Sequence, residues 1–203
     1  ALQQVVGEHV QQKGSLVNSE RLRFDFSNDE AVTEEQIRQI EHIVNDQILA
    51  NTVVATEVMS MDDAISKGAM ALFGEKYGEE VRVLSMGGDF SVELCGGTHA
   101  SQTGDIGSVR VTNESSVASG VRRIEAVTGV RAIAYCDALQ DTIGEVATVV
   151  RASGNNLADK VRQMLEDNRR LQKEVDTLKN KLANASGTDL MAGIKDINGV
   201  SVL

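Results

Sequence analysis

The sequence has no proline, only two cysteines, and no apolar run approaching the length of a membrane span. Without proline, the boundaries between its elements must be marked by glycine, asparagine and serine. Two cysteines, no signal peptide and no run of about 18 apolar residues argue against an oxidising compartment and against a transmembrane protein. We therefore expect a protein of the reducing cytoplasm, without contact to a membrane.

Basic residues are also outnumbered by acidic ones, which gives a formal net charge of −10. Proteins that bind nucleic acid contact phosphates through clustered lysine and arginine, so this balance lowers the expected affinity for RNA unless a local basic patch exists. At 203 residues the chain can bury one good core and a second, smaller unit.

The segment 89–99 reads DFSVELCGGTH and carries the most reactive side chains of the chain. Apolar and polar residues alternate over 90–94, which predicts a half-buried strand that ends at Cys95. Gly96 and Gly97 disfavour a helix by about 1 kcal/mol each, and they suit a tight loop that folds His99 back toward the thiol. A thiolate and an imidazole so placed are half of a tetrahedral zinc site. Taken alone, the pair is better explained by an inert core cysteine beside an unrelated histidine.

Three blocks, at residues 88–99, 103–107 and 120–129, give the motif a context. Their order and spacing closely resemble the editing domain of bacterial alanyl-tRNA synthetases. That domain is shared with threonyl-tRNA synthetases and with free-standing alanyl-tRNA editing proteins. Further likenesses lie at 9–15, 69–77 and 155–161, and the last two favour the alanyl enzyme.

The resemblance implies an α+β fold, with an antiparallel or mixed sheet and flanking helices, of the threonyl/alanyl-tRNA synthetase second additional domain type. A long coiled-coil helix is expected to follow. We expect an editing domain truncated at its amino end over 1–151, the coiled-coil segment over 152–186, and a linker with the start of a C-terminal domain over 187–203.

The implied function is hydrolysis of the ester that joins serine or glycine to tRNA(Ala), at the acceptor end. The parent enzyme would attach alanine to tRNA(Ala) with ATP, but these 203 residues contain no ATP-binding motif. Two alternatives remain open: a non-catalytic tRNA-binding or oligomerisation module with a structural zinc site, and a free-standing alanyl-tRNA editing hydrolase.

The family's metal is zinc, so the resemblance makes Cys95 and His99 ligands. Relatives add a His-x-x-x-His pair, which this chain lacks, and we expect these two further ligands upstream of residue 1. The resemblance implies Gln12 and Ser15 as catalytic pocket residues, although the stretch in isolation is better explained as a polar loop. With three ligands zinc generates hydroxide. With four it positions the substrate, which we favour slightly, and polar neighbours such as Gln12 would hold the water.

Other local patterns predict secondary structure. Residues 33–36 form a capping box before a helix that runs to about Ala50, with His42 on its solvated face. Strands are expected over 22–26, 53–59, 81–86, 106–112 and 121–128. Arg122 and Arg123 would then point to opposite faces, so at most one can reach a tRNA end, and surface ion pairs would explain both equally well.

The second half predicts two helices. The helix over 130–150 is expected to pack on the sheet with Cys136 in the core. After a break at 153–156, apolar residues recur by four and three, with Asn168 at one a position, as in a coiled coil. Its partner is either the preceding helix, which the short loop favours slightly, or a second chain in a homodimer. The apolar positions are Leu157, Val161, Met164, Leu171, Val175, Leu178, Leu182 and Ala185.

Overall fold

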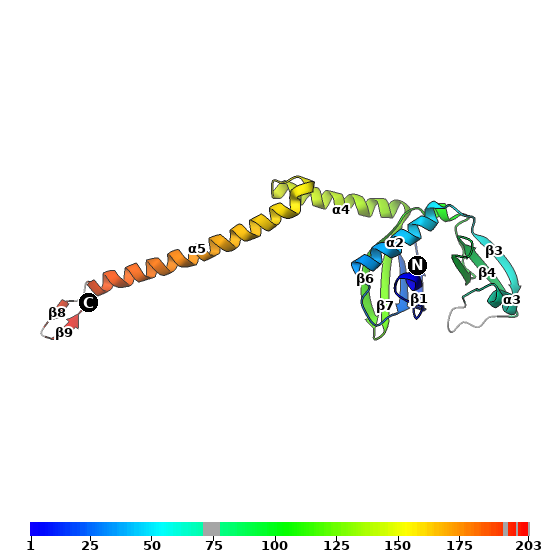
Figure 1. Cartoon of the computed structure of the whole chain (residues 1–203), viewed down its shortest axis with the longest axis horizontal. Helices are drawn as coiled ribbons and strands as arrows, with labels where there is room; N and C mark the ends of the chain where they lie inside the picture. Colours follow the sequence, from blue (N-terminus) through cyan, green and yellow to red (C-terminus); the bar gives the residue numbers. More distant parts are fainter. Residues whose placement is uncertain (71–77, 193–194, 198, 203) are drawn as a thin grey trace. The chain divides into compact units, whose positions relative to one another are not determined.

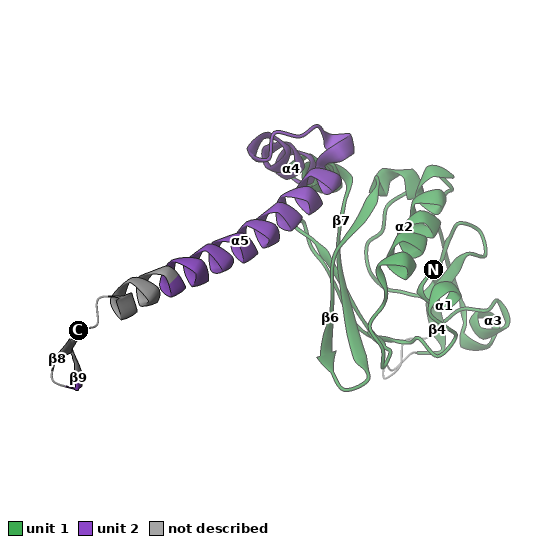
Figure 2. Ribbon diagram, turned by 60° about the vertical axis from the view of Figure 1, so that its left-hand side comes forward, with its two compact units in different colours: residues 1–138 green, residues 139–203 purple. Residues whose placement is uncertain are grey.

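The computed structural model describes residues 1–70, 78–192, 195–197 and 199–202. It divides the chain into two compact units, Ala1–Ala138 and Leu139–Leu203 (Figure 2). The division falls inside helix α4 (Gly129–Val149), earlier than the boundary at 151/152 expected from the sequence. The physical reason is that Ala132, near the start of α4, is buried in the first unit, whereas Leu139 and Ile143 remain exposed.

The first unit is built on a four-stranded sheet with the order β1-β2-β7-β6 (Figure 1). Every neighbouring pair is antiparallel. The Asn18 side chain accepts the N–H groups of Glu20 and Arg21 and stabilises the turn between the first two strands. The strands are β1 (Gln12–Val17), β2 (Leu22–Ser27), β6 (Val109–Ala118) and β7 (Val121–Thr128).

Helix α2 (Glu34–Leu49) packs against this sheet and forms its main core. Phe26 of β2 is fully buried, and Ile40 of the helix and Ile124 of β7 lie in the same cluster, which the short helix α1 (Leu2–Val5) also joins. The capping box is present as predicted, since the Thr33 side chain accepts the N–H of Gln36 and the Gln36 side chain accepts that of Thr33.

A second sheet in the same unit has the order β3-β4-β5, again antiparallel. Its strands are β3 (Ala55–Ser60), β4 (Glu80–Met86) and β5 (Ser91–Leu94). Helix α3 (Met61–Ser66) packs its buried Ala64 against Val83 and Leu94. Most of the likeness block at 69–77 lies outside the described residues.

The 3₁₀ turn η1 (Thr103–Ile106) connects the two sheets. Its buried Thr103 hydroxyl donates to the carbonyl of Gln47 at 2.8 Å and accepts the N–H of Thr52 at 2.9 Å. The predicted strand over 106–112 therefore starts later, at Val109. The delay has a backbone cause: Gly107 adopts φ 70°, and a Cβ there would lie 2.7 Å from Cα of Gly129.

The second unit contains the end of α4, the turn η2 (Gly154–Asn156), helix α5 (Leu157–Ala192) and a hairpin of β8 (Lys195–Ile197) and β9 (Val200–Val202). Helix α5 continues through 186–188, where the sequence predicted a linker. Serine, glycine and threonine each weaken a helix by about 1 kcal/mol or less, a cost that a long helix can absorb. No helix among the described residues is long and apolar enough to span a bilayer.

Most of the large apolar residues of α4 and α5 are exposed, which corrects two predictions about α4. Helix α4 does not bury Val130, Ile133 or Ile143 on the sheet, and Cys136 is exposed instead of lying in the core. Leu171 and Leu178 of α5 are exposed, and both the coiled coil and its partner stay predictions. Spacing specifies which face of a helix is apolar, but not what covers it.

Candidate metal centre

Strand β5 delivers Cys95 as the sequence predicted. The N–H of Cys95 donates to the carbonyl of Arg82 at 3.1 Å, which extends the pairing of β4 with β5 by one residue. The chain then turns through Gly96 and Gly97. Cys95 is half-buried and His99 is exposed, so the loop carries its two reactive side chains at the surface of the second sheet.

Gly97 shows that the two side chains converge. A Cβ at this position would lie 3.6 Å from Nε2 of His99 and 3.7 Å from Sγ of Cys95, whereas a Cβ on Gly96 would meet nothing within 4 Å. The loop therefore folds His99 back toward the thiol, as predicted. Glycine at 97 leaves open the space that both donor atoms face.

Arg82 of β4 holds the same loop with its side chain. Its Nη1 atom donates to the carbonyl of Cys95 at 2.9 Å and to that of Gly97 at 2.6 Å. Sequence reasoning missed this residue. The sequence feature that could have indicated it is the position of Arg82 in the apolar strand 81–86, on the opposite face from buried Val81 and Val83.

The charges around His99 favour a neutral imidazole. Partial burial lowers the pKa of His99, and the positive charge of Arg82 lowers it further, while Glu93 acts in the opposite direction. A neutral imidazole has a lone pair for a metal, so His99 is in the ligand-competent form near pH 7.

A thiol and a neutral imidazole beside one open space fit zinc as two of its ligands. Among the described residues, no group of three or more histidine, cysteine or acidic side chains completes a site. His9 contacts Oδ1 of Asn28 at 2.7 Å, and His42 lies on α2 beside Asp46. The exposure of His42 confirms its predicted place on the solvated face of the helix.

Gln12 and Ser15 lie on β1 of the first sheet. Gln12 is half-buried, pairs with Phe26 and precedes a bulge, whereas Ser15 is exposed and pairs with Phe24. The structure brings Cys95 and His99 together, but it records no hydrogen bond between that pair and Gln12 or Ser15 in the described part of the chain. Their catalytic role stays a prediction.

Arg122 and Arg123 lie opposite Phe26 and Asp25 respectively, and therefore on opposite faces of β7. Each guanidinium makes two hydrogen bonds to one carboxylate: Arg122 to Glu114, and Arg123 to Asp25 at 2.7 and 2.8 Å. These ion pairs satisfy both residues within the sheet. They favour the structural explanation over contact with a tRNA end.

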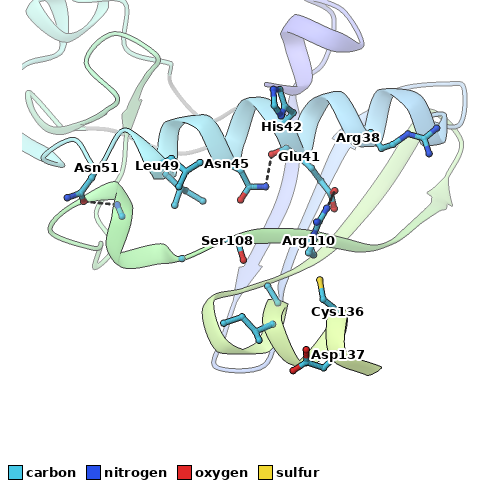
Figure 3. A pocket seen from close by; sticks show the side chains of 15 residues that line it. Arg38, Glu41, His42, Asn45, Leu49, Asn51, Ser108, Arg110, Cys136 and Asp137 are labelled. Atoms are coloured by element: carbon cyan, nitrogen blue, oxygen red, sulfur yellow. Dashed lines mark hydrogen bonds and ion pairs between the residues drawn. The ribbon is translucent and has the colours of Figure 1, made fainter. Parts of the chain in front are cut away.

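A separate hollow of about 820 Å³ lies between α2, β6 and the start of α4 (Figure 3). The ion pair of Glu41 with Arg110, at 2.9 Å, forms part of its wall, and Cys136 and Asp137 face it from α4. Neither candidate metal ligand lines this hollow, so it is distinct from the Cys95 loop.

Comparison with known proteins gives the loop a family context. Residues 81–125 match the family described as Threonyl and Alanyl tRNA synthetase second additional domain. Over all 203 residues, the chain is 61% identical to an alanine–tRNA ligase of Pseudomonas fluorescens, 60% identical to one of Saccharophagus degradans and 59% identical to one of Pseudomonas savastanoi. In sequence, this chain is similar to a segment of these alanine–tRNA ligases. It spans 23% of the length of each of these relatives.

The synthetase domain match covers the part of the chain that carries the candidate site. Residues 81–125 include most of β4, all of β5 with its loop, η1, β6 and the first half of β7. Arg82, Cys95 and His99 therefore all lie within the matched domain, whereas Gln12 and Ser15 lie outside it. The α+β class and the antiparallel sheets agree with the predicted fold.

Proposed function

We propose that this chain is the editing segment of an alanine–tRNA ligase, which hydrolyses the ester of serine or glycine on tRNA(Ala). The observation that carries the proposal is the convergence of Cys95 and His99 around Gly97, inside the residues that match the synthetase domain. The parent enzyme would attach alanine to tRNA(Ala) with ATP, using parts outside these residues.

Recognition chemistry explains why such a site is needed. A pocket for alanine cannot exclude glycine sterically, and an apolar pocket rejects an added hydroxyl, as in serine, by only about a hundredfold. A second site that cleaves the wrong esters raises accuracy further. The ester bond lies at the acceptor end of the tRNA, which is therefore the proposed partner.

In this proposal Cys95 and His99 hold zinc, and Gly97 keeps the space beside their donor atoms free. Bound zinc would act as a Lewis acid that orients the substrate or activates water. Burial lowers the pKa of the Ala1 amino group, and the charge of Glu93 on β5 acts in the opposite direction. We propose that the remaining two ligands come from residues that precede this segment in the longer relatives.

Gln12 and Ser15 take polar roles at the pocket. The Gln12 side chain can accept from water and donate to an ester oxygen, and its half-buried place at the bulge of β1 limits its mobility. We assign Gln12 to holding the attacking water, and Ser15 to contact with the acylated ribose.

Helix α5 supplies a second proposed partner, another copy of the chain. Its apolar stripe, which includes Leu171, Val175 and Leu178, is exposed in a single chain. A coiled coil of two chains would bury it. The proposed location is the cytoplasm, which suits two free cysteines.

The test is release of serine from Ser-tRNA(Ala), with Ala-tRNA(Ala) as the control substrate. It uses the 203-residue chain, and a version extended at its amino end to the length of its relatives. We expect the extended protein to hydrolyse Ser-tRNA(Ala), and Cys95→Ala to abolish this activity while alanine charging persists. Absence of hydrolysis in both proteins would contradict the proposal.

Two other outcomes would identify the alternatives. Zinc binding without any ester hydrolysis would indicate a tRNA-binding or oligomerisation module with a structural metal. Full hydrolysis by the 203-residue chain alone would indicate a free-standing editing hydrolase. Equal loss of editing and alanine charging in Cys95→Ala would mean that the thiol supports the fold instead.

A further inference from the structure

We propose that Arg82 is a positioning residue that holds the loop from Cys95 to His99 in the shape required for metal binding. The identity of the metal rests on the proposed function, whereas the hydrogen bonds from Arg82 to the loop are observed independently of it. Arg82 acts through the loop and is not proposed to contact metal or substrate.

Three hydrogen bonds of one residue support this role. The carbonyl of Arg82 accepts the N–H of Cys95 at 3.1 Å, so β4 holds the start of the loop. Nη1 of the same residue donates to the carbonyls of Cys95 and Gly97, at 2.9 and 2.6 Å. Arg82 therefore binds the backbone on both sides of Gly96.

The loop needs such support because its centre consists of two glycines. Glycine loses more conformational freedom on ordering than any other residue, so a Gly-Gly pair samples many backbone shapes unless contacts restrict it. A Cβ added to Gly96 would have no neighbour within 4 Å, so packing does not hold this residue. Hydrogen bonds from a charged donor are about twice as strong as neutral ones, which makes the guanidinium an effective clamp.

Arg82 is itself well anchored. The residues on either side of it, Val81 and Val83, are 5% and 1% exposed in the core of the second sheet. Its backbone lies in the central strand, paired with Val58 of β3 on one side. A site supported by a rigid strand keeps its geometry better than one supported by a loop alone. Nη1 of the planar guanidinium reaches both carbonyls, and a lysine ammonium on its flexible stem would reproduce these contacts only in part.

The first experiment measures protection of Cys95 from alkylation by iodoacetamide across a zinc titration, with peptide mass spectrometry as the readout. Cys136 lies outside the candidate site and serves as the internal reference thiol. Arg82→Ala and Arg82→Lys are compared with Arg38→Ala, a matched control whose exposed guanidinium pairs with Glu34 and Glu35 on α2. Thermal unfolding of each variant checks that it is folded.

We expect Arg82→Ala to raise the zinc concentration for half-protection by about tenfold or more, because two charge-assisted hydrogen bonds are lost. Arg82→Lys should recover part of the loss, and Arg38→Ala should match the parent chain. An unchanged half-protection concentration in Arg82→Ala would overturn the proposal. If Arg82→Ala fails to fold, Arg82→Lys carries the test. A smaller increase in the zinc concentration for half-protection is then expected, and the absence of any increase would contradict the clamp.

A second measurement without metal separates this inference from the zinc proposal. NMR order parameters of the Gly96 and Gly97 amides should fall from about 0.85 to below about 0.6 in Arg82→Ala, while those of α2 stay constant. If zinc never protects Cys95 even in the protein extended at its amino end, but the order parameters fall, the zinc proposal fails and the clamp stands. Unchanged order parameters would refute the clamp itself.

Discussion

The side chain of Asn45 pairs with the backbone of Val109 much as a neighbouring strand would. Its Nδ2 donates to the Val109 carbonyl at 3.0 Å, and its Oδ1 accepts the Val109 N–H at 2.8 Å. One turn earlier, Glu41 accepts the N–H of Val111 at 2.6 Å. Strand β6 lies at the edge of its sheet, so α2 satisfies backbone groups that an edge strand would otherwise expose.

The first prediction is that Asn45→Leu lowers the free energy of unfolding by about 2 kcal/mol or more, because two backbone groups of Val109 lose their partners. Urea unfolding measures the change. His42→Ala is the control on the same helix, since that side chain is 81% exposed. Equal stability of Asn45→Leu and the parent chain would show that water replaces the amide without cost.

The second prediction concerns acid stability. The hydrogen bonds from Arg123 lower the pKa of Asp25 most strongly, the charges of Arg123 and Arg23 lower it further, and burial opposes them. A folded-state pKa below the unfolded value of about 4 stabilises the protein above that pH, and the contribution disappears as pH falls through the folded pKa.

Asp25→Asn should therefore lower the urea midpoint at pH 7 and should flatten the loss of stability below about pH 4. Asp89→Asn, at an exposed position, serves as the control. Parallel stability profiles of Asp25→Asn and the parent chain across this range would be inconsistent with the assignment.

The third prediction uses the two glycines of the metal loop. Gly97→Ala places a methyl group 3.6 and 3.7 Å from the two donor atoms, so it should weaken zinc protection of Cys95 without lowering the melting temperature. Gly96→Ala is a matched control, because a Cβ there meets nothing and neither glycine has a positive φ. Equal zinc titrations for both variants would place the metal elsewhere.

The fourth prediction concerns helix α5. An amide at an a position is costly to bury but selects one register, so Asn168→Val should strengthen association of the apolar stripe and loosen its specificity. Sedimentation at several concentrations, for the parent chain and the variant, measures this. If both remain monomeric and equally stable, the register role of Asn168 is wrong.

Local patterns were predictable where the responsible forces are local. The capping box at Thr33, the helix it starts, and the strand that ends at Cys95 follow from side-chain periodicity and from hydrogen bonds between near neighbours. The convergence of Cys95 and His99 was also predictable, because two glycines within a five-residue span permit a tight turn. The start of β6 was not, because it depends on the approach of Gly107 to Gly129.

The sequence alone determined the identity and spacing of the candidate ligands, the alternation that builds the sheets, and the resemblance to the synthetase domain. Only the tertiary structure decided which side chains support that site and which remain exposed. Arg82 lies 13 residues before Cys95, and its side chain contacts the Cys95 carbonyl because β4 and β5 pair. Cys136 has apolar neighbours in sequence, yet it is exposed on α4. The physical reason is that such contacts depend on how separate elements pack, and sequence periodicity specifies the buried face of an element without naming its partner.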